Sequence, residues 1–193
     1  GYRLGYVVFP QHAVDLKAQF KKILATEYTA VSTPIQHAAV PGFEISKDMD
    51  EYFEITRNIH HIMGEYTHNS LLEIEGVKVT KPEATFYLLA DFNAFATDLQ
   101  KVKITTSQKL SESLMVHPYH TAIVGGDSLV LERTDFSARI AYVDYDGAKV
   151  YENYKKQKPK THSERTEFVK SNAPKMVQGI KMIARFFEDI RNK

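Results

Sequence analysis

The feature of this sequence that most constrains its fold is a long apolar stripe between residues 52 and 66. Its members are spaced at intervals of 3, 4, 3 and 4 residues, and they are Tyr52, Ile55, Ile59, Ile62 and Tyr66. Such spacing puts the side chains on one face of an α-helix of about five turns. The sequence therefore predicts one long helix that connects the N-terminal segment to the rest of the chain.

Capping residues mark where this long helix begins. Ser46 is a suitable N-cap, and Asp48 and Asp50 fall in the first turn, where carboxylates interact favourably with the positive end of the helix dipole. Ahead of it, we expect a strand over residues 2–9 and helices over 11–25 and 32–45. These first 45 residues are too few to form a domain of their own.

Shorter patterns occupy the chain after the long helix. Alternating or continuous apolar runs predict strands, and a stripe from Val169 to Ile190 predicts a C-terminal helix that begins near Asn172. Asp146-Gly147 predicts a turn, and the basic stretch 155–162 predicts an exposed loop. The expected strands cover 77–81, 85–90, 121–124, 128–131 and 138–143, and a further short helix covers 107–116. The fold class is α/β, with a compact α+β unit after the connecting helix.

Composition excludes several classes of function. The 193 residues contain no cysteine, which excludes disulfides and thiolate chemistry. The formal net charge of +1 gives no overall field that would attract nucleic acid or an anionic membrane. No apolar run approaches the roughly 20 residues that a membrane span requires. We expect a soluble cytoplasmic protein with neither nucleic-acid nor membrane partners.

Two arginines lie where a cation is costly. Arg3 is inside the first strand pattern, and Arg139 is flanked by apolar residues in FSARIAYV. Arginine is rarely buried without an anionic partner, and its planar fork fits a carboxylate or a phosphate. Each could bind such an anion as a ligand. Each could equally form a structural ion pair with an acidic side chain.

A histidine-rich stretch offers a different chemistry. His61, Glu65 and His68 are spaced i, i+4 and i+7, which places them on one face of the long helix. Imidazole and carboxylate groups at that spacing could bind zinc. Gly64 weakens the helix at this point, and solvated polar positions opposite the apolar stripe explain the same residues. We expect no metal site here, and binding of zinc remains the alternative.

Several segments, taken in order, resemble motifs of the fold-type I pyridoxal-phosphate aminotransferases of class I/II. The segment GYRLGYVVFP resembles the G-[WY]-R-[LI]-G-[YW] motif that comes after the cofactor-binding lysine, and KPEATFYLLADF resembles the P-x-G-x-F-Y strand. The pair HTAIVGGDSLV and FSARIAYV resembles the ending V-x-V-x-P-G-x-x-F … R-[IL]-S-x-A. STPIQHAAV resembles the helix that comes after the first motif.

The resemblance implies a fold, a cofactor and roles for both arginines. Residues 1–45 would be the end of the large cofactor-binding domain, and residues 46–193 the small C-terminal domain with its connecting helix. Arg3 would bind the phosphate of pyridoxal 5'-phosphate, and Arg139 would bind the α-carboxylate of the substrate. The reaction would transfer an amino group from an amino acid to a 2-oxo acid in a homodimer. A lyase or decarboxylase of the same fold, or a non-catalytic binding or assembly module, stays open.

The resemblance also predicts what this chain lacks. In the family, the Schiff-base lysine precedes the residue that matches Arg3 by about eight positions, which places it upstream of Gly1, and none of the lysines here matches its motif. We therefore expect a C-terminal portion that is inactive alone, without its N-terminal large-domain segment. Ala84 and Gly125 differ from the family's usual glycine and proline, and both differences bear on the substrate class.

Overall fold

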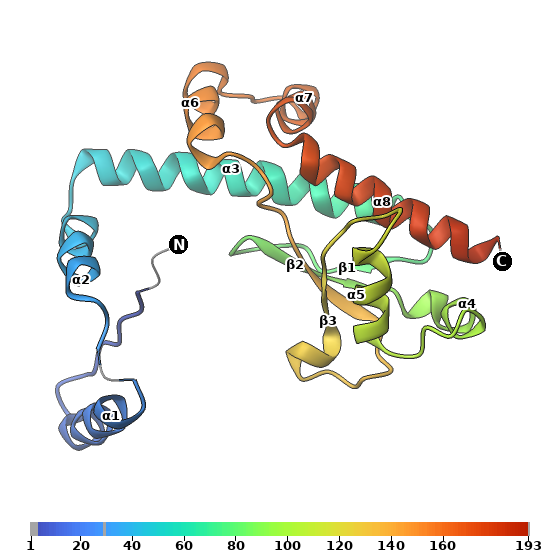
Figure 1. Cartoon of the computed structure of the whole chain (residues 1–193). Coiled ribbons are helices and arrows are strands. Elements are labelled where there is room, and N and C mark those ends of the chain that lie inside the picture. Colours follow the sequence, from blue (N-terminus) through green and yellow to red (C-terminus); the bar gives the residue numbers. More distant parts are fainter. Residues whose placement is uncertain (1–3, 29, 193) are drawn as a thin grey trace. The chain divides into compact units, whose positions relative to one another are not determined.

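The structure, a computed structural model, describes residues 4–28 and 30–192. The chain divides into two compact units, residues 1–52 and 53–193. Figure 1 shows the order of the elements along the chain. The assignment of residues 1–45 to a large cofactor domain and of 46–193 to a small domain stays a prediction.

The first unit is made of helices and connecting segments. Its helices are α1 (Val14–Glu27) and α2 (Thr33–Ala39), with a 3-10 turn at Val40–Phe43 after them. Both predicted helices are therefore confirmed. Pro34 lies in the first turn of α2, where its missing N–H leaves no hydrogen bond unmade.

The strand predicted over residues 2–9 is wrong across its described part. Residues 4–10 form no regular element, because a strand requires a second strand to pair with its backbone and none of residues 4–28 and 30–192 pairs here. The ring of Tyr6 instead meets the ring of Phe43 edge to face, with centroids 5.0 Å apart. Arg3 lies outside the described residues.

The long helix predicted from the apolar stripe is α3 (Lys47–Leu72). The backbone N–H of Met49 donates a hydrogen bond of 3.2 Å to the hydroxyl of Ser46, so the predicted N-cap is confirmed. Ile55, Ile59 and Ile62 are buried, as the stripe predicts. Helix α3 begins in the first unit and continues into the second.

The second unit contains a four-stranded antiparallel sheet in the order β1-β2-β4-β3. Its strands are β1 (Lys78–Val79), β2 (Tyr87–Asp91), β3 (Val124–Gly125) and β4 (Ser137–Ala141). The strands expected over 77–81, 85–90 and 138–143 are found with shifted ends. Of the expected strand 121–124 only the end forms, because the N–H of Thr121 donates to the carbonyl of Leu114 instead of to the sheet.

The strand expected over residues 128–131 is wrong. Residues Gly126–Leu129 form a 3-10 turn, and Val130 comes next in the left-handed conformation with φ 65°. A residue in that conformation cannot continue a strand.

Helices complete the second unit. They are α4 (Ala96–Lys101), preceded by a 3-10 turn at Asn93–Phe95, α5 (Ser107–Met115), α6 (Gly147–Gln157), α7 (His162–Asn172) and α8 (Pro174–Arg191). The predicted helix 107–116 and the start of the C-terminal helix near Asn172 are confirmed. No helix in the described part of the chain is long and apolar enough to cross a membrane.

Two predicted loops are partly helical. Asp146 does not make a simple turn: its carboxylate accepts a 3.0 Å hydrogen bond from the N–H of Lys149 and caps α6. Within 155–162, helix α6 continues to Gln157, and Thr161 forms a capping box with Glu164 at the start of α7. Both differences have one cause, since polar residues that favour turns also favour helix N-caps.

The core of the second unit joins α3, the sheet and α8. Figure 1 shows α3 and α8 running beside each other, and the hydroxyl of Thr67 on α3 lies 3.7 Å from the sulfur of Met176 on α8. The ring of Phe187 stacks on Phe92 and packs against Phe95, with centroids 4.7 and 4.3 Å away. In β2, and in β4 from Ala138 onward, burial alternates, so one face of each strand is in this core.

Candidate functional site

Arg139 lies in the middle of β4, on the face of the sheet that is turned away from the core. In the antiparallel register it is opposite Leu89 of β2 and Val124 of β3. Residues directly opposite each other in such a sheet point to the same side. Tyr87, Leu89, Val124, Arg139 and Ala141 therefore share one face, which we call the Arg139 face, and none of the five is buried.

The guanidinium group of Arg139 is held by an aromatic ring. Its Cζ atom lies 4.6 Å from the centroid of the Tyr87 ring. The two residues are diagonal neighbours on adjacent strands, a separation that long side chains can bridge. A cation over an aromatic face is attracted by the ring quadrupole. Tyr87 thus orients the guanidinium on this face.

The hydrogen-bonding capacity of Arg139 is unfilled. Its Nε atom is buried without a partner, and among residues 4–28 and 30–192 no carboxylate forms an ion pair with it. A structural ion pair, the alternative role for this arginine, therefore has no partner in the described residues. The terminal nitrogens are not enclosed, so this guanidinium can bind an incoming carboxylate through two parallel hydrogen bonds.

Gly125 lies beside this site, at a position where only glycine fits. It comes directly after Val124, the β3 residue opposite Arg139, and a Cβ atom added to Gly125 would lie 2.7 Å from the carbonyl oxygen of Ser107. No side chain fits there without a backbone shift. The close approach of β3 to the start of α5 therefore requires a glycine at this position.

The remaining predicted site residues are not brought to Arg139. Arg3 lies outside the described residues, so its position relative to Arg139 is a matter of prediction. Glu65 forms an ion pair of 3.3 Å with Arg165, and the His68 ring lies 3.0 Å from the amide oxygen of Asn69. No group of three His, Asp or Glu side chains in the described chain is arranged to hold a metal ion.

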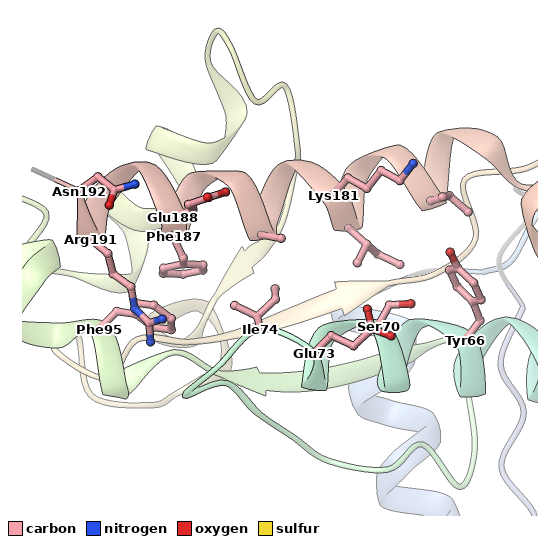
Figure 2. A pocket seen from close by; sticks show the side chains of 13 residues that line it. Tyr66, Ser70, Glu73, Ile74, Phe95, Lys181, Phe187, Glu188, Arg191 and Asn192 are labelled. Atoms are coloured by element: carbon pink, nitrogen blue, oxygen red, sulfur yellow. The ribbon is translucent and has the colours of Figure 1, made fainter.

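A groove between α3 and α8 is a second concave surface. Its volume is about 490 Å³, and Figure 2 shows side chains of both helices lining it. Arg191 at one end is already satisfied, because it donates 2.7 Å to the carbonyl of Glu75 and stacks over Phe95 at 4.6 Å. The other cation of the groove, Lys181, is exposed and is not held by an aromatic ring among the described residues, in contrast to Arg139, so the Arg139 face is the better candidate site.

Tyr87 is the residue of this site that the sequence did not assign. The FY pair of KPEATFYLLADF was noted only as part of a strand motif. The rule for diagonal pairs would have identified Tyr87 had the register of β2 against β4 been known. That register joins residues about 50 positions apart, as in Leu89↔Arg139, and no local pattern determines it.

Comparison with known proteins gives the family. Residues 1–150 match the sequence model described as aminotransferase class I and II. The chain belongs to this family, as its ordered motifs predicted. Members of the family are generally dependent on pyridoxal phosphate.

Three curated relatives are similar over parts of their length. A probable aspartate/prephenate aminotransferase of Aquifex aeolicus (strain VF5) is 30% identical over 119 residues, which are 60% of this chain and 27% of the relative. A bifunctional aspartate aminotransferase and glutamate/aspartate-prephenate aminotransferase of Petunia hybrida is 30% identical over 95 residues, 49% of this chain and 19% of that one. An aspartate aminotransferase of Pinus pinaster is 23% identical over 143 residues, which are 74% of this chain and 28% of the relative.

A solved structure has the same fold. The aromatic aminotransferase of Pyrococcus horikoshii OT3 matches with a TM-score of 0.61 at 20% identity, over 98% of this chain and 40% of that one. The mixed α/β architecture is therefore that of an aminotransferase. This chain spans well under half the length of the relatives and of the structure it matches.

Proposed function

We propose that this chain is part of a pyridoxal-phosphate-dependent aminotransferase that transfers an amino group from an amino acid to a 2-oxo acid. The observation that carries the proposal is the unfilled guanidinium of Arg139 on the sheet face of a chain from this family. Both substrates carry an α-carboxylate, which is the group that a planar guanidinium binds best. Arg139 would bind that carboxylate in each half of the reaction.

Arg139 and Tyr87 would fix the orientation of the substrate. A carboxylate bound through two hydrogen bonds cannot rotate freely about the Arg139 guanidinium. The ring of Tyr87, 4.6 Å from Cζ, holds the plane of that group before the substrate arrives. Positioning of this kind contributes to catalysis because the reacting bond is already aligned.

The cofactor would be held by other residues of the protein. Arg3 matches the family's phosphate-binding arginine, and the terminal nitrogens of Arg139, which are not enclosed, suit a carboxylate of the substrate. When bound, pyridoxal phosphate supplies the electron sink for the chemistry at the substrate's α-carbon. We expect a homodimer of the complete protein, and a cytoplasmic location stays a prediction.

The chain alone should bind 2-oxo acids weakly and should not transaminate. None of its lysines matches the family's nucleophile motif, and a lysine is the covalent catalyst in this chemistry. Incubation with pyridoxal phosphate, aspartate and 2-oxoglutarate is therefore expected to yield no glutamate above the level of a protein-free control. Sustained formation of glutamate by the chain would contradict this expectation.

Binding by Arg139 can be tested separately. The ¹⁵N-labelled chain is titrated with pyruvate and, as a neutral control, with pyruvamide, while the NMR signals of the Arg139 Nε–H and of the Leu89 and Val124 amides are monitored. Pyruvate should shift all three saturably, and pyruvamide should not. Substitution Arg139→Met should abolish the response. The same response to pyruvate in the Arg139→Met variant would exclude the proposed role.

A further inference from the structure

A further concave site lies where the second half of α3 meets residues 81–86. This His60 cleft has a volume of about 480 Å³, and it is defined by Arg57, His60, Lys81, Pro82, Phe86 and Tyr142. A volume of this size is within the range of small-molecule sites. The cleft shares no residue with the Arg139 face.

The segments that form the walls of the cleft pack closely against each other. A Cβ atom added to Gly64 of α3 would lie 3.1 Å from both Pro82 and the Tyr142 hydroxyl, so glycine permits the helix to approach this closely. The Tyr142 hydroxyl donates a 3.2 Å hydrogen bond to the carbonyl of Thr85. Thr85 has φ 66°, a costly conformation for a β-branched residue. Strain of this kind persists where surrounding contacts over-determine the backbone, and it is frequent at binding sites.

The interior of the cleft is aromatic and only partly covered. Phe86 is 39% exposed, although Leu88, two positions further along the chain, is in the core. The rings of Phe86 and His60 lie 6.2 Å apart with an angle of 32° between their planes. Tyr142 also lines the cleft, but it is only 2% exposed and so backs the cleft without an open ring face. The rings of Phe86 and His60 can hold a flat apolar molecule by stacking and edge contacts.

The rim of the cleft favours an anion. Arg57 and Lys81 contribute two permanent positive charges, and of the two carboxylates there, that of Glu65 is already paired with Arg165. The remaining carboxylate belongs to Glu83. One carboxylate therefore faces two cations, so a negatively charged ligand meets a net attraction.

His60 adds a neutral hydrogen-bond donor. Burial lowers the pKa of its imidazole, so the ring is uncharged at neutral pH. Its Nδ1 atom is enclosed without a partner, so the tautomer with the proton on Nε2 avoids a buried N–H that has no acceptor. In that tautomer Nε2 donates and can bind a carboxylate oxygen.

We infer that the His60 cleft binds a small flat molecule with one carboxylate, of the size of phenylacetate. The aromatic walls take the ring, and Arg57, Lys81 and His60 bind the carboxylate. This site is separate from the proposed substrate-binding role of Arg139, because the residues that form it lie on α3, on the 81–86 segment and at Tyr142.

The test is an NMR titration of the ¹⁵N-labelled chain with phenylacetate and with its neutral amide, phenylacetamide. Phenylacetate should shift the amides of residues 57–65 and 81–86 saturably, in the millimolar range expected of a ligand with about ten non-hydrogen atoms. Phenylacetamide should bind about fivefold more weakly, because it lacks the charge-assisted hydrogen bonds. Equal affinity for the two compounds would exclude a carboxylate site.

Variants separate this site from others. Phe86→Leu should weaken phenylacetate binding about fivefold through loss of the aromatic contact, whereas Phe43→Leu, at an exposed ring of the first unit, should leave it unchanged. Unaltered affinity in Phe86→Leu, or shifts that grow linearly without saturation, would overturn the inference.

Discussion

Residues 4–52 and residues 53–192 both contain apolar residues at helical spacing, but they differ in whether these residues are buried. In the first region, none of the described residues is buried, and apolar side chains such as Ile23 on α1 and Phe43 remain exposed. In the second, side chains from α3, the sheet and α8 form one continuous core. Apolar residues at helical spacing are thus present in both regions, but only one of them buries its apolar residues.

Helical periodicity predicts a helix but says little about the stability of that helix. Helix α1 has 14 residues and no buried side chain, and an isolated helix of that length is marginal in water. Helix α8 has 18 residues and buries seven of them, among them Phe186 and Phe187. Most helical stability in proteins comes from such packing. The second region should therefore dominate the free energy of unfolding.

The largest expected effect comes from removing a core ring. Phe187 is fully enclosed and packs against Phe92 and Phe95, so Phe187→Ala should lower the free energy of unfolding by about 3–5 kcal/mol. Urea denaturation monitored by circular dichroism at 222 nm measures this change.

The matched change in the first region is Phe43→Ala. Its ring is 61% exposed and has an edge contact with Tyr6, so the loss should not exceed about 1 kcal/mol. If both substitutions lowered the free energy of unfolding equally, residues 4–52 would contribute to stability as a packed region does, and the contrast would be wrong.

Removal of a side-chain amide in each region should change the free energy of unfolding by a smaller amount. Asn93 joins β2 to β4: its amide nitrogen donates to Asp91 and Asp135, and its oxygen accepts from the N–H of Phe136 at 3.0 Å. Because Asn93→Ala leaves these groups to water, it should lower the free energy of unfolding by about 1 kcal/mol.

Gln36 provides the control for this amide. Its amide nitrogen donates a hydrogen bond of 2.7 Å to the backbone carbonyl of Val31, and this bond is solvent-exposed and local. Gln36→Ala should stay within about 0.5 kcal/mol of the unsubstituted chain in the same urea assay. A larger loss for Gln36→Ala than for Asn93→Ala would reverse the expected ranking of the two regions.

The same contrast explains which parts of the fold the sequence could predict. The stripe through Ile55, Ile59 and Ile62 and the cap at Ser46 are local signals, and both are confirmed. The strand expected at residues 2–9 is wrong in its described part, because apolar alternation cannot supply a pairing partner. β1 and β3 have two residues each, and a strand this short is determined by its neighbours in the sheet.

The candidate sites likewise have one part that local sequence predicts and another part that depends on contacts between distant residues. Arg139 could be singled out locally, because a charge inside an apolar strand is unusual. Its contact with Tyr87 depends on the register of two strands far apart in sequence. The His60 cleft likewise joins α3 to Phe86 and Tyr142. The histidine pattern alone offered zinc binding on one helix face as an alternative, and it could not indicate a cleft formed with distant residues.

The smallest expected effect at neutral pH concerns Tyr145, a partly buried tyrosine of the second region. Burial, with a further contribution from Tyr142, raises the pKa of Tyr145 to about 12, while in the unfolded chain it is about 10. The folded state thus keeps the proton in a range where the unfolded state loses it. The free energy of unfolding therefore keeps its full value with respect to this group below pH 10, and it falls as the pH rises from 10 to about 12, because only the unfolded state ionises there.

Substitution of this tyrosine by phenylalanine isolates the effect of its hydroxyl. Tyr145→Phe should change the free energy of unfolding little at pH 7 and should make its decline between about pH 10 and pH 12 less steep. Tyr28→Phe, at an exposed ring of the first region, should leave the pH dependence as it is in the unsubstituted chain. Urea titrations at a series of pH values measure all three curves. A decline as steep in Tyr145→Phe as in the unsubstituted chain would mean that the Tyr145 hydroxyl is not desolvated by folding.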